Sequence, residues 1–452
     1  MTVAVALFTR DLRVHDNPVL HAAATCADRV IPVFVLDPAI IKTGFAGPNR
    51  ADFLARSLAD LDDALRERGA ALVVRRGDPL QELAELVAEH DVTDVHLAAD
   101  VSGQAQRRQG ALVGELDVGV HLHDASITTV APGAVTPSGG GAHFAVFTPY
   151  LRRWQETGQR SPLPPPDRVR MPDVDPGKVP EAAEISFGDP AEDLVRGGER
   201  NGRSMLSAWA DELVDDYSSG HDDLAGDRTS RLSPHLHFGT LSPTEVVQRV
   251  GTRTRGAQEF VRQVAWRDFH HQVLAANPRT STEDYRPRGD DWRDAPEELR
   301  AWKEGRTGYP IVDAGMRQLL REGWMHNRAR VITASFLTKT LHHDWRAGAR
   351  HFLWHLVDGD VANNQMNWQW VAGTGTDTRP NRVLNPLRQA ERYDPRGDYV
   401  RRYVPELRGI DGPAVHAPWE LPADQRRALS YPEPIVDLDF GRRRFLDARK
   451  AD

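Results

Sequence analysis

Val3–Phe8, with the sequence VAVALF, is the first of five short apolar runs that alternate with helical patterns along residues 1–125. Helix starts between these runs carry a capping residue followed by proline, at Asn17-Pro18 and at Asp78-Pro79. Short apolar strands separated by helices predict a parallel sheet covered on both faces, and therefore an α/β domain. No GxGxxG motif follows the first run, which argues against a dinucleotide site of the usual kind. The predicted strands are Val3–Phe8, Val30–Val35, Ala71–Arg75, Val95–Ala98 and Val120–Leu122.

The sequence changes character after residue 125. Residues 126–195 include a Gly/Ser turn region and a strongly proline-rich stretch, which favours a long connector between domains. From about residue 196 the strand signals fade and helical patterns take over, so residues 196–452 are expected to form an all-α domain. Ser242–Glu245 (SPTE) has the form of a complete capping box with proline in the first helical position. Pro310–Leu341 carries apolar residues at helical spacing, interrupted near Gly323.

The composition limits the kinds of site that the chain can hold. Its 452 residues have a net charge of −8, so any polyanion must be met by a local basic patch. Arg379–Arg408 holds eight arginines and four acids, which is either such a patch or a solvated, salt-bridged surface. Cys26 is the only cysteine, which excludes a disulfide framework and a cysteine-based zinc site and favours an intracellular protein. No apolar run approaches about 18 residues, so we expect no membrane span and a cytoplasmic location.

Asp358–Asp377 is the most unusual segment, because DGDVANNQMNWQWVAGTGTD places acids and adjacent amides beside a Trp-Gln-Trp triplet. Buried acids and amides are costly unless a polar partner satisfies them, so the segment predicts the wall of a pocket for a flat heteroaromatic ligand. Eight of the chain's 11 tryptophans fall between Trp266 and Trp370. They form either an aromatic core or a set of stacking and redox-active surfaces.

Three further motifs place polar groups at helix starts or within helical patterns. Asp227–Pro234 (DRTSRLSP) offers hydroxyls and free backbone N–H groups, which suit either a phosphate or plain capping of the next helix. The Arg267-Asp268 pair predicts a semi-buried ion pair, or an arginine that stabilises negative charge on a flat ring. Trp324–Arg330 (WMHNRAR) is either a solvated basic face or a polar cluster that needs acids, for which Asp358 and Asp360 are candidates.

These motifs together resemble the cryptochrome/photolyase family over nearly the whole chain and in the same order. The likeness is greatest to class I cyclobutane pyrimidine dimer photolyases of the actinobacterial, deazaflavin-binding type. It implies a Rossmann-like parallel sheet followed by an all-α FAD-binding domain, and light-driven repair of UV-damaged DNA by a monomer without a metal. FTRDLRVHDNP (8–18) and FTPYLRRW (147–154) resemble the N-terminal domain of the family. TSRLSPHLHFG (229–239), WRDFHH (266–271), TGYPIVDAGMRQL (307–319), GWMHNRARVITASFL (323–337) and the segment 358–377 resemble its flavin domain.

The resemblance also implies roles for individual residues. Residues expected to hold the FAD phosphates and flank the cofactor are Tyr217, Thr229, Ser230, Arg231, Leu232, Ser233 and Phe260. Those expected around the isoalloxazine are Arg267, Asp358, Asp360 and Asn364, with the Asn364 amide facing flavin N5. Contacts to the extruded lesion and DNA are expected from Trp266, Gln263, Asn327, Arg328, Trp370 and Arg382. The indole chain that photoreduces the flavin is expected at Trp292, Trp345 and Trp368. An 8-hydroxy-5-deazariboflavin antenna is expected at Arg10, Phe34, Leu36, Asp37, Arg50 and Asp100.

Several positions depart from the pattern of the dimer photolyases. Gln263 stands where many have a Glu, and Val331 stands where they commonly have Met. These two changes favour a second hypothesis, a blue-light photoreceptor of the cryptochrome type without repair activity. Retention of Trp266, Trp370, Asn327, Asn364 and Arg382 favours repair. The other departures are Phe260 for a Trp, His221 for an Arg, and Ser102 and Gly103 where folate antennas find Asn and Glu.

Overall fold

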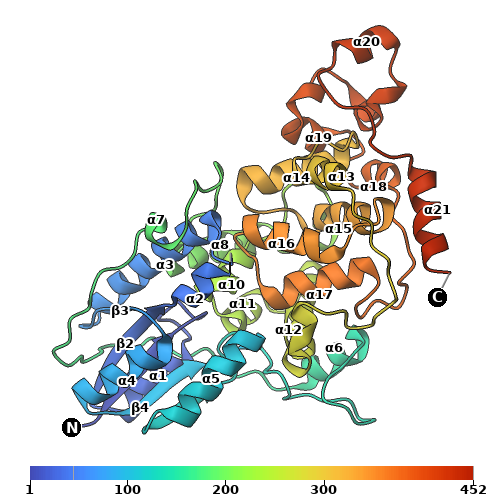
Figure 1. Ribbon diagram of the computed structural model, residues 1–452. Coiled ribbons are helices and arrows are strands. Elements are labelled where there is room, and N and C mark those ends of the chain that lie inside the picture. The colour runs from blue at the N-terminus through green and yellow to red at the C-terminus, as the bar shows by residue number, and fades with distance from the viewer. Residues whose placement is uncertain (44, 451–452) are drawn as a thin grey trace.

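The computed structural model of the protein describes residues 1–43 and 45–450. A five-stranded parallel sheet with its helices lies on one side, and a larger helical region lies on the other (Figure 1). The strand order is β3-β2-β1-β4-β5, so each successive strand is added at an edge of the growing sheet. The strands are β1 Val3–Phe8, β2 Arg29–Leu36, β3 Val73–Arg76, β4 Val92–Ala98 and β5 Gly119–His123. The five predicted strands are confirmed, and β1 has the predicted bounds.

Two apolar layers cover the sheet, as the uninterrupted hydrophobic run of β1 requires. Ala4, Ala6 and Phe8 face a core shared with α1 and α3, while Val3, Val5 and Leu7 face a core shared with α4 and α5. The predicted helix starts are confirmed: the Asn17 side chain accepts from Leu20 N, and the Asp78 side chain accepts from Leu80 N. The helices of this domain are α1 Pro18–Cys26, α2 Pro38–Lys42, α3 Pro48–Arg66, α4 Pro79–His90 and α5 Gly103–Glu115.

The segment 126–195 joins the two regions and packs on both of them. Its two helices are α6 Phe147–Glu156 and α7 Ala182–Ile185. Buried aromatic side chains of α6 belong to a core of the helical region. Further along, the segment lies against the sheet domain, where Val30 N donates to Arg170 O (2.7 Å) and Val74 N to Pro176 O (2.8 Å). The proline-rich stretch is therefore a strap along the first domain.

The described part of the chain from residue 196 onward contains helices and no strand. The predicted interruption at Gly323 is confirmed, because α14 ends at Glu322 and Gly323 caps it in a left-handed conformation (φ 61°). The α-helices are α8 Glu199–Glu212, α9 Tyr217–Gly220, α10 Ser233–Phe238, α11 Pro243–Val250, α12 Arg255–Ala276, α13 Pro296–Lys303, α14 Pro310–Glu322, α15 Asn327–Ser335, α16 Trp345–His355, α17 Val361–Ala372, α18 Pro386–Tyr393, α19 Asp398–Tyr403, α20 Ala423–Ala428 and α21 Leu438–Ala448. A π-helical turn, η2 Phe336–Thr340, follows α15, and short 3-10 turns are η1 Pro278–Ser281, η3 Pro405–Leu407, η4 Gly412–His416 and η5 Pro418–Glu420.

The predicted capping box at the start of α11 is only half formed. Ser242 Oγ accepts from Glu245 N (3.3 Å), as expected for the cap. The Glu245 carboxylate pairs with Arg203 (3.1 Å), and Ser242 Oγ also contacts Asp16 of the sheet domain. Tertiary ion pairing has therefore replaced the second half of the local motif. Within the described ranges, no helix has the length and hydrophobicity to cross a membrane.

Candidate functional site

A cavity of about 600 Å³ opens in the helical region between α9, the turn before α10, α12, α15, α17 and α18. Every residue that the sequence predicts to bind FAD lines this cavity, and so does every residue predicted to contact DNA or the lesion. The four substituted positions His221, Phe260, Gln263 and Val331 lie in the same wall. Segments separated by more than 150 residues thus meet around one space, which is large enough for a cofactor.

Three polar atoms in the wall of the cavity fit a polar ligand. Thr229 Oγ1, His237 Nδ1 and Asp358 Oδ1 are buried, and no described residue forms a hydrogen bond with any of them. Buried polar atoms without partners are costly and therefore rare in native proteins. A hydroxyl, an imidazole nitrogen and a carboxylate oxygen offer both donors and acceptors, so this donor set suits a ligand with phosphate, ribityl and ring N–H groups.

The turn before α10 is stiffened by its own ion pairs. Arg231 has a left-handed backbone (φ 51°), and its guanidinium pairs with Asp227 (2.7 Å) and Glu322 (2.8 Å). The same guanidinium lies 4.3 Å from the ring centre of Trp324, whose Nε1 donates to Ser233 Oγ (3.2 Å). Arg231 therefore holds the turn, and the hydroxyls of Thr229 and Ser230 are the groups that it presents to the cavity.

Asn364 of α17 presents an acceptor to the cavity. Its Nδ2 donates to Ala349 O (3.2 Å) and to Gln365 Oε1 (2.9 Å). Gln365 Nε2 in turn donates to Ser281 O (2.6 Å), which fixes the orientation of both amides. Since no described residue donates to Asn364 Oδ1, this oxygen can accept a hydrogen bond from a ligand N–H without supplying a proton.

The arginines of the Trp324–Arg330 motif are paired, but only one of them as expected. Arg330 Nη2 contacts Asp358 Oδ2 (2.8 Å), which confirms that acid as a partner. Arg328 pairs instead with Asp222 (2.7 Å), so the expectation that Asp360 would serve this motif is wrong. Asp360 pairs instead with Arg10 of the sheet domain.

Arg267 and Asp268 are both buried, yet they form a long pair of 3.8 Å because each has better partners. Arg267, which lines the cavity, donates to Ile127 O and Leu236 O. Asp268 Oδ2 accepts from Thr129 N (3.0 Å), Val130 N (3.0 Å) and Trp154 Nε1 (2.9 Å). Burial raises the pKa of Asp268 to about 6, so the carboxylate is ionised at neutral pH.

Two half-buried indoles lie at the cavity with aromatic or cationic support. The Trp266 ring stacks on Phe147 of α6, with centroids 3.7 Å apart and an interplanar angle of 9°. The Arg382 guanidinium lies 5.4 Å from the ring centre of Trp370. Both indoles line the cavity, so each offers a supported aromatic surface to a flat partner.

Of the three predicted relay tryptophans, only Trp368 lines the cavity. It is buried against α16, where a Cβ added at Gly348 would lie 2.2 Å from Trp368 Cη2. Trp345 starts the same helix and is fully buried, with Nε1 donating to Asp284 (2.8 Å). Trp292 is half-buried beside His342, 5.3 Å between ring centres. Trp302 was not among the predicted relay residues, and its ring centre lies 6.0 Å from that of Trp368.

The six predicted antenna residues are spread over the sheet domain. Phe34 and Leu36 lie in its core, and Asp37 caps α2 by accepting from Ala39 N (2.7 Å). Arg50 is buried, and Arg10 and Asp100 are partly buried, where this domain meets α16 and α17. Ser102 caps α5 through Ala105 N (3.2 Å), and Gly103 is its first residue.

His237 and Asn363 also line the cavity and were not predicted. The signal for His237 was its place in Thr229–Gly239, and that for Asn363 was the adjacent amide pair with Asn364. Burial lowers the pKa of His237 well below its usual value, and the charge of Arg10 lowers it further. The imidazole is therefore neutral and can offer Nδ1 as either donor or acceptor.

Comparison with known proteins identifies both parts of the chain. Residues 4–167 match the family model described as DNA photolyase, and residues 260–451 match the one described as FAD binding domain of DNA photolyase. A protein of Streptomyces griseus named deoxyribodipyrimidine photo-lyase is 56% identical and aligns over 100% of both chains. The crystal structure of a class III photolyase from Agrobacterium tumefaciens superposes with a TM-score of 0.93 at 35% identity, covering 100% of this chain and 97% of that one.

An archaeal photolyase from Sulfolobus tokodaii, solved with two FAD molecules, superposes with a TM-score of 0.86 at 31% identity over 100% of both chains. Full-length identity, two matching family models and a shared fold agree with the cavity geometry. The chain belongs to the photolyase/cryptochrome family.

Proposed function

We propose that the protein repairs cyclobutane pyrimidine dimers in DNA with the energy of blue light, as a deoxyribodipyrimidine photo-lyase. One observation carries this proposal: the wall predicted to hold FAD and the wall predicted to hold the lesion enclose a single cavity. The 56% identical relative that bears this enzyme name supports the same activity. When bound and reduced, FAD supplies a light-released electron that the dimer returns after its ring has split.

No residue in this proposal has to gain or lose a proton during turnover, so the task of the chain is positioning and electrostatics. Thr229 and Ser230 hold phosphate oxygens at the turn before α10. Asn364 Oδ1, whose amide is oriented by Ala349 O and Gln365 Oε1, would accept from the ring N–H at flavin N5, which suits a reduced anionic cofactor. Asp360 and Arg267, which line the same cavity, would hold the polar edge of that ring.

At the mouth of the cavity, Trp266 and Trp370 stack on the extruded bases of the dimer. Arg382 is next to Trp370 and contacts the DNA backbone, where its charge adds a salt-dependent contribution to affinity. Asn327 and Gln263 offer amides to the base edges, and a Gln at this position can donate to a thymine carbonyl. This is why the change from Glu to Gln is compatible with repair.

The second candidate function is a signalling photoreceptor, which Val331 and Gln263 favour. Anaerobic incubation of the reduced protein with dimer-containing oligothymidine under blue light separates the two. Repair predicts that thymine absorbance recovers under light and stays flat in a parallel dark sample. Absence of light-dependent recovery, in protein that still binds the oligonucleotide, would exclude the repair function.

We also propose that the antenna is 8-hydroxy-5-deazariboflavin, and that the protein acts as a monomer in the cytoplasm. Arg50 supports an antenna near α3, because its Nε and Nη2 are buried and no described residue accepts from them. Burial lowers the pKa of Arg50 to about 9, so the guanidinium stays charged and favours an anionic ring. A blue-absorbing band that persists after full reduction of FAD is expected in gently purified protein, and an Arg50→Leu variant should lose it.

A further inference from the structure

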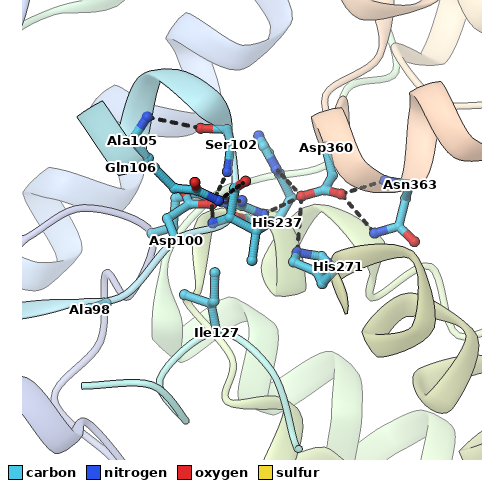
Figure 2. A network of polar contacts seen from close by, with 12 residues as sticks. Ala98, Asp100, Ser102, Ala105, Gln106, Ile127, His237, His271, Asp360 and Asn363 are labelled. Carbon is cyan, nitrogen blue, oxygen red and sulfur yellow. Dashed lines mark hydrogen bonds and ion pairs between the residues drawn. The ribbon is translucent and has the colours of Figure 1, made fainter. Parts of the chain in front are cut away.

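Arg10 links the sheet domain to the first turn of α17. It follows β1, and its Nη1 lies 3.3 Å from both oxygens of Asp100, in the loop after β4. Its Nη2 donates to Asp360 Oδ2, and its Nε donates to His237 O (3.2 Å). Figure 2 shows Asp100 on the side of the sheet domain and Asp360 at the start of α17, with His237 and His271 beside it. One guanidinium therefore joins β1, β4, α10 and α17.

The two carboxylate oxygens of Asp360 bind different domains: one caps α17 and the other contacts Arg10 of the sheet domain. Oδ1 accepts from Asn363 N and from Asn363 Nδ2, both at 2.7 Å, and so caps α17. Oδ2 receives Arg10, so the cap is held at a fixed place relative to the sheet. Asn363 lines the cavity, and Asn364, which presents its free oxygen to the ligand, is the next residue. Any shift of Asp360 is thus transmitted to the flavin-facing side of α17.

The charged and titratable groups that face this carboxylate come from three other elements. Arg10 faces it from the end of β1, His237 Nδ1 (4.0 Å) from α10, and His271 Nε2 (3.6 Å) and Arg267 from α12. Burial by itself would raise the pKa of Asp360, but Arg10, His271 and Arg267 hold it well below its usual range. Without Arg10, the buried Asp100 and Asp360 would lose the cation that they share.

Arg50 reaches the same turn of the chain from α3. Its Nη1 donates to Leu353 O and Leu356 O, and a Cβ added at Gly359 would lie 2.6 Å from that nitrogen. The glycine between Asp358 and Asp360 is therefore needed for the close approach of Arg50. Two arginines of the sheet domain converge on a turn that belongs to the flavin cavity.

We propose that Arg10 is a positioning residue for the flavin: the sheet domain, through the Arg10 bridge from Asp100 to Asp360, fixes the start of α17 and thereby the affinity for the isoalloxazine. This inference rests on the proposed function, because it takes FAD as the occupant of the cavity. The competing explanation is that Arg10 is an interdomain staple that contributes to stability only.

Fluorescence titration of apoprotein with FAD, repeated from mildly acidic to mildly alkaline pH, distinguishes the two. Arg10→Ala should weaken FAD binding by about tenfold. It should also make binding pH-dependent, because Asp360 or Asp100 then takes up a proton in the accessible range. Arg10→Lys keeps the charge without the planar fork and should recover part of the affinity.

Arg160→Ala is the matched control. Arg160 pairs with the buried Asp16 of the same domain, and its side chain is 27% exposed against 20% for Arg10. This variant should lose stability but bind FAD with the affinity and pH profile of the wild type. If Arg10→Ala and Arg160→Ala behave alike in the titration, the inference is wrong.

Asp100→Asn keeps the inference testable if Arg10→Ala does not fold. It leaves the contact between Arg10 and Asp360 in place and removes only the charge of the sheet-domain anchor. A few-fold loss of FAD affinity is expected, and unchanged affinity in both Asp100→Asn and Arg10→Lys would overturn the proposal. Wild-type apoprotein that binds no FAD would instead overturn the proposed function, so the two failures are distinguishable.

Discussion

Ser57 in the sheet domain and Thr229 at the helical cavity both carry a buried hydroxyl, but only the hydroxyl of Ser57 is hydrogen-bonded within the described part of the protein. Ser57 Oγ donates to Phe53 O (2.6 Å) and accepts from Gly198 N (3.1 Å). Thr229 Oγ1 has no partner among the residues that the structure describes. The same contrast holds for charged groups: Arg13 donates to Asp16 O, Ser126 O and Gly239 O, whereas Asp358 Oδ1 is left without a donor. We call the buried polar groups whose partners lie in the protein the frame, and a buried polar atom without a protein partner in the wall of the cavity is available to a ligand.

Asp268 on α12 is a group of the frame that can be tested directly. Asp268 does not line the cavity and its Oδ2 receives three donors, so Asp268→Ala should lower the free energy of unfolding by about 3–5 kcal/mol. The loss follows because Thr129 N, Val130 N and Trp154 Nε1 would remain buried without an acceptor. Urea denaturation measures it, with Asp189→Ala as an exposed control. Equal stability of the two variants would show that Asp268 is not part of the frame.

Lys339 is a second buried charged group of the frame, and it lies against the loop that carries Arg382. Its ammonium is buried and donates to Pro380 O (2.7 Å) and Arg382 O (2.8 Å). Burial lowers the pKa of Lys339 from 10.5 to about 7, although Asp377 opposes the change. Between these two values the unfolded chain binds more protons than the folded one, so stability rises with pH by roughly 1 kcal/mol per unit.

Lys339→Met should remove that rise, which urea denaturation at neutral and alkaline pH measures. The difference in unfolding free energy between wild type and variant should grow in favour of the wild type as the pH increases. Lys178→Met, at an exposed lysine, should leave the slope unchanged. Parallel curves for wild type and Lys339→Met would mean that the buried lysine stays charged throughout.

Trp368 and Trp302 are neighbouring buried indoles, but only Trp368 lines the cavity and is expected to pass electrons to the flavin. Trp368→Phe should slow photoreduction of oxidised flavin at least about tenfold, equivalent to ~1.4 kcal/mol of barrier, while repair by chemically reduced protein continues. Trp302→Phe is the matched control, because this buried indole also contacts Trp368 but donates Nε1 to Thr333 O (3.0 Å). Bleaching of the oxidised-flavin absorbance under light, with an external reductant present, measures both variants. Equal slowing in both would indicate that Trp368 acts through packing alone.

Local sequence rules predicted the frame better than they predicted the site. The bounds of β1, the caps at Asn17 and Asp78 and the stop at Gly323 depend on neighbouring residues only, and all are confirmed. The SPTE motif shows where such rules fail: a capping box depends on local contacts, but Glu245 found Arg203 instead. A local rule cannot rank a tertiary ion pair against a cap of similar strength.

The resemblance to a family predicted which residues line the cavity, but it did not predict the ion pairs that hold those residues in place. Asp222 and Arg328 are 106 positions apart, and Arg10 and Asp360 are 350 apart. Such pairs depend on how two domains and a strap pack against each other, which neither periodicity nor motif spacing encodes. Arg10 and Arg50 illustrate the consequence: both were expected at the antenna, and both also contact the turn around Asp358–Asp360, which no motif spacing predicted.

Ser57→Ala and Thr229→Val put the opening comparison to a direct test. Ser57→Ala removes an oxygen that serves two backbone groups, so it should lower the free energy of unfolding by about 1–2 kcal/mol and leave FAD affinity unchanged. Thr229→Val removes an oxygen with no protein partner, so stability without FAD should change by less than about 0.5 kcal/mol. Thr229→Val should instead lower the affinity for FAD, by roughly three- to tenfold.

Urea denaturation of the two apoproteins gives the unfolding free energy of each variant, and titration with FAD gives the affinity of each. Ser57→Ala should have the larger effect on stability and Thr229→Val the larger effect on FAD affinity, if the Thr229 oxygen serves the cofactor as proposed. A Thr229→Val variant that loses stability as Ser57→Ala does, and binds FAD like the wild type, would show that the unpaired hydroxyl does not mark the ligand. In that case Asp358 Oδ1 and His237 Nδ1 would have to carry the assignment of the cavity on their own.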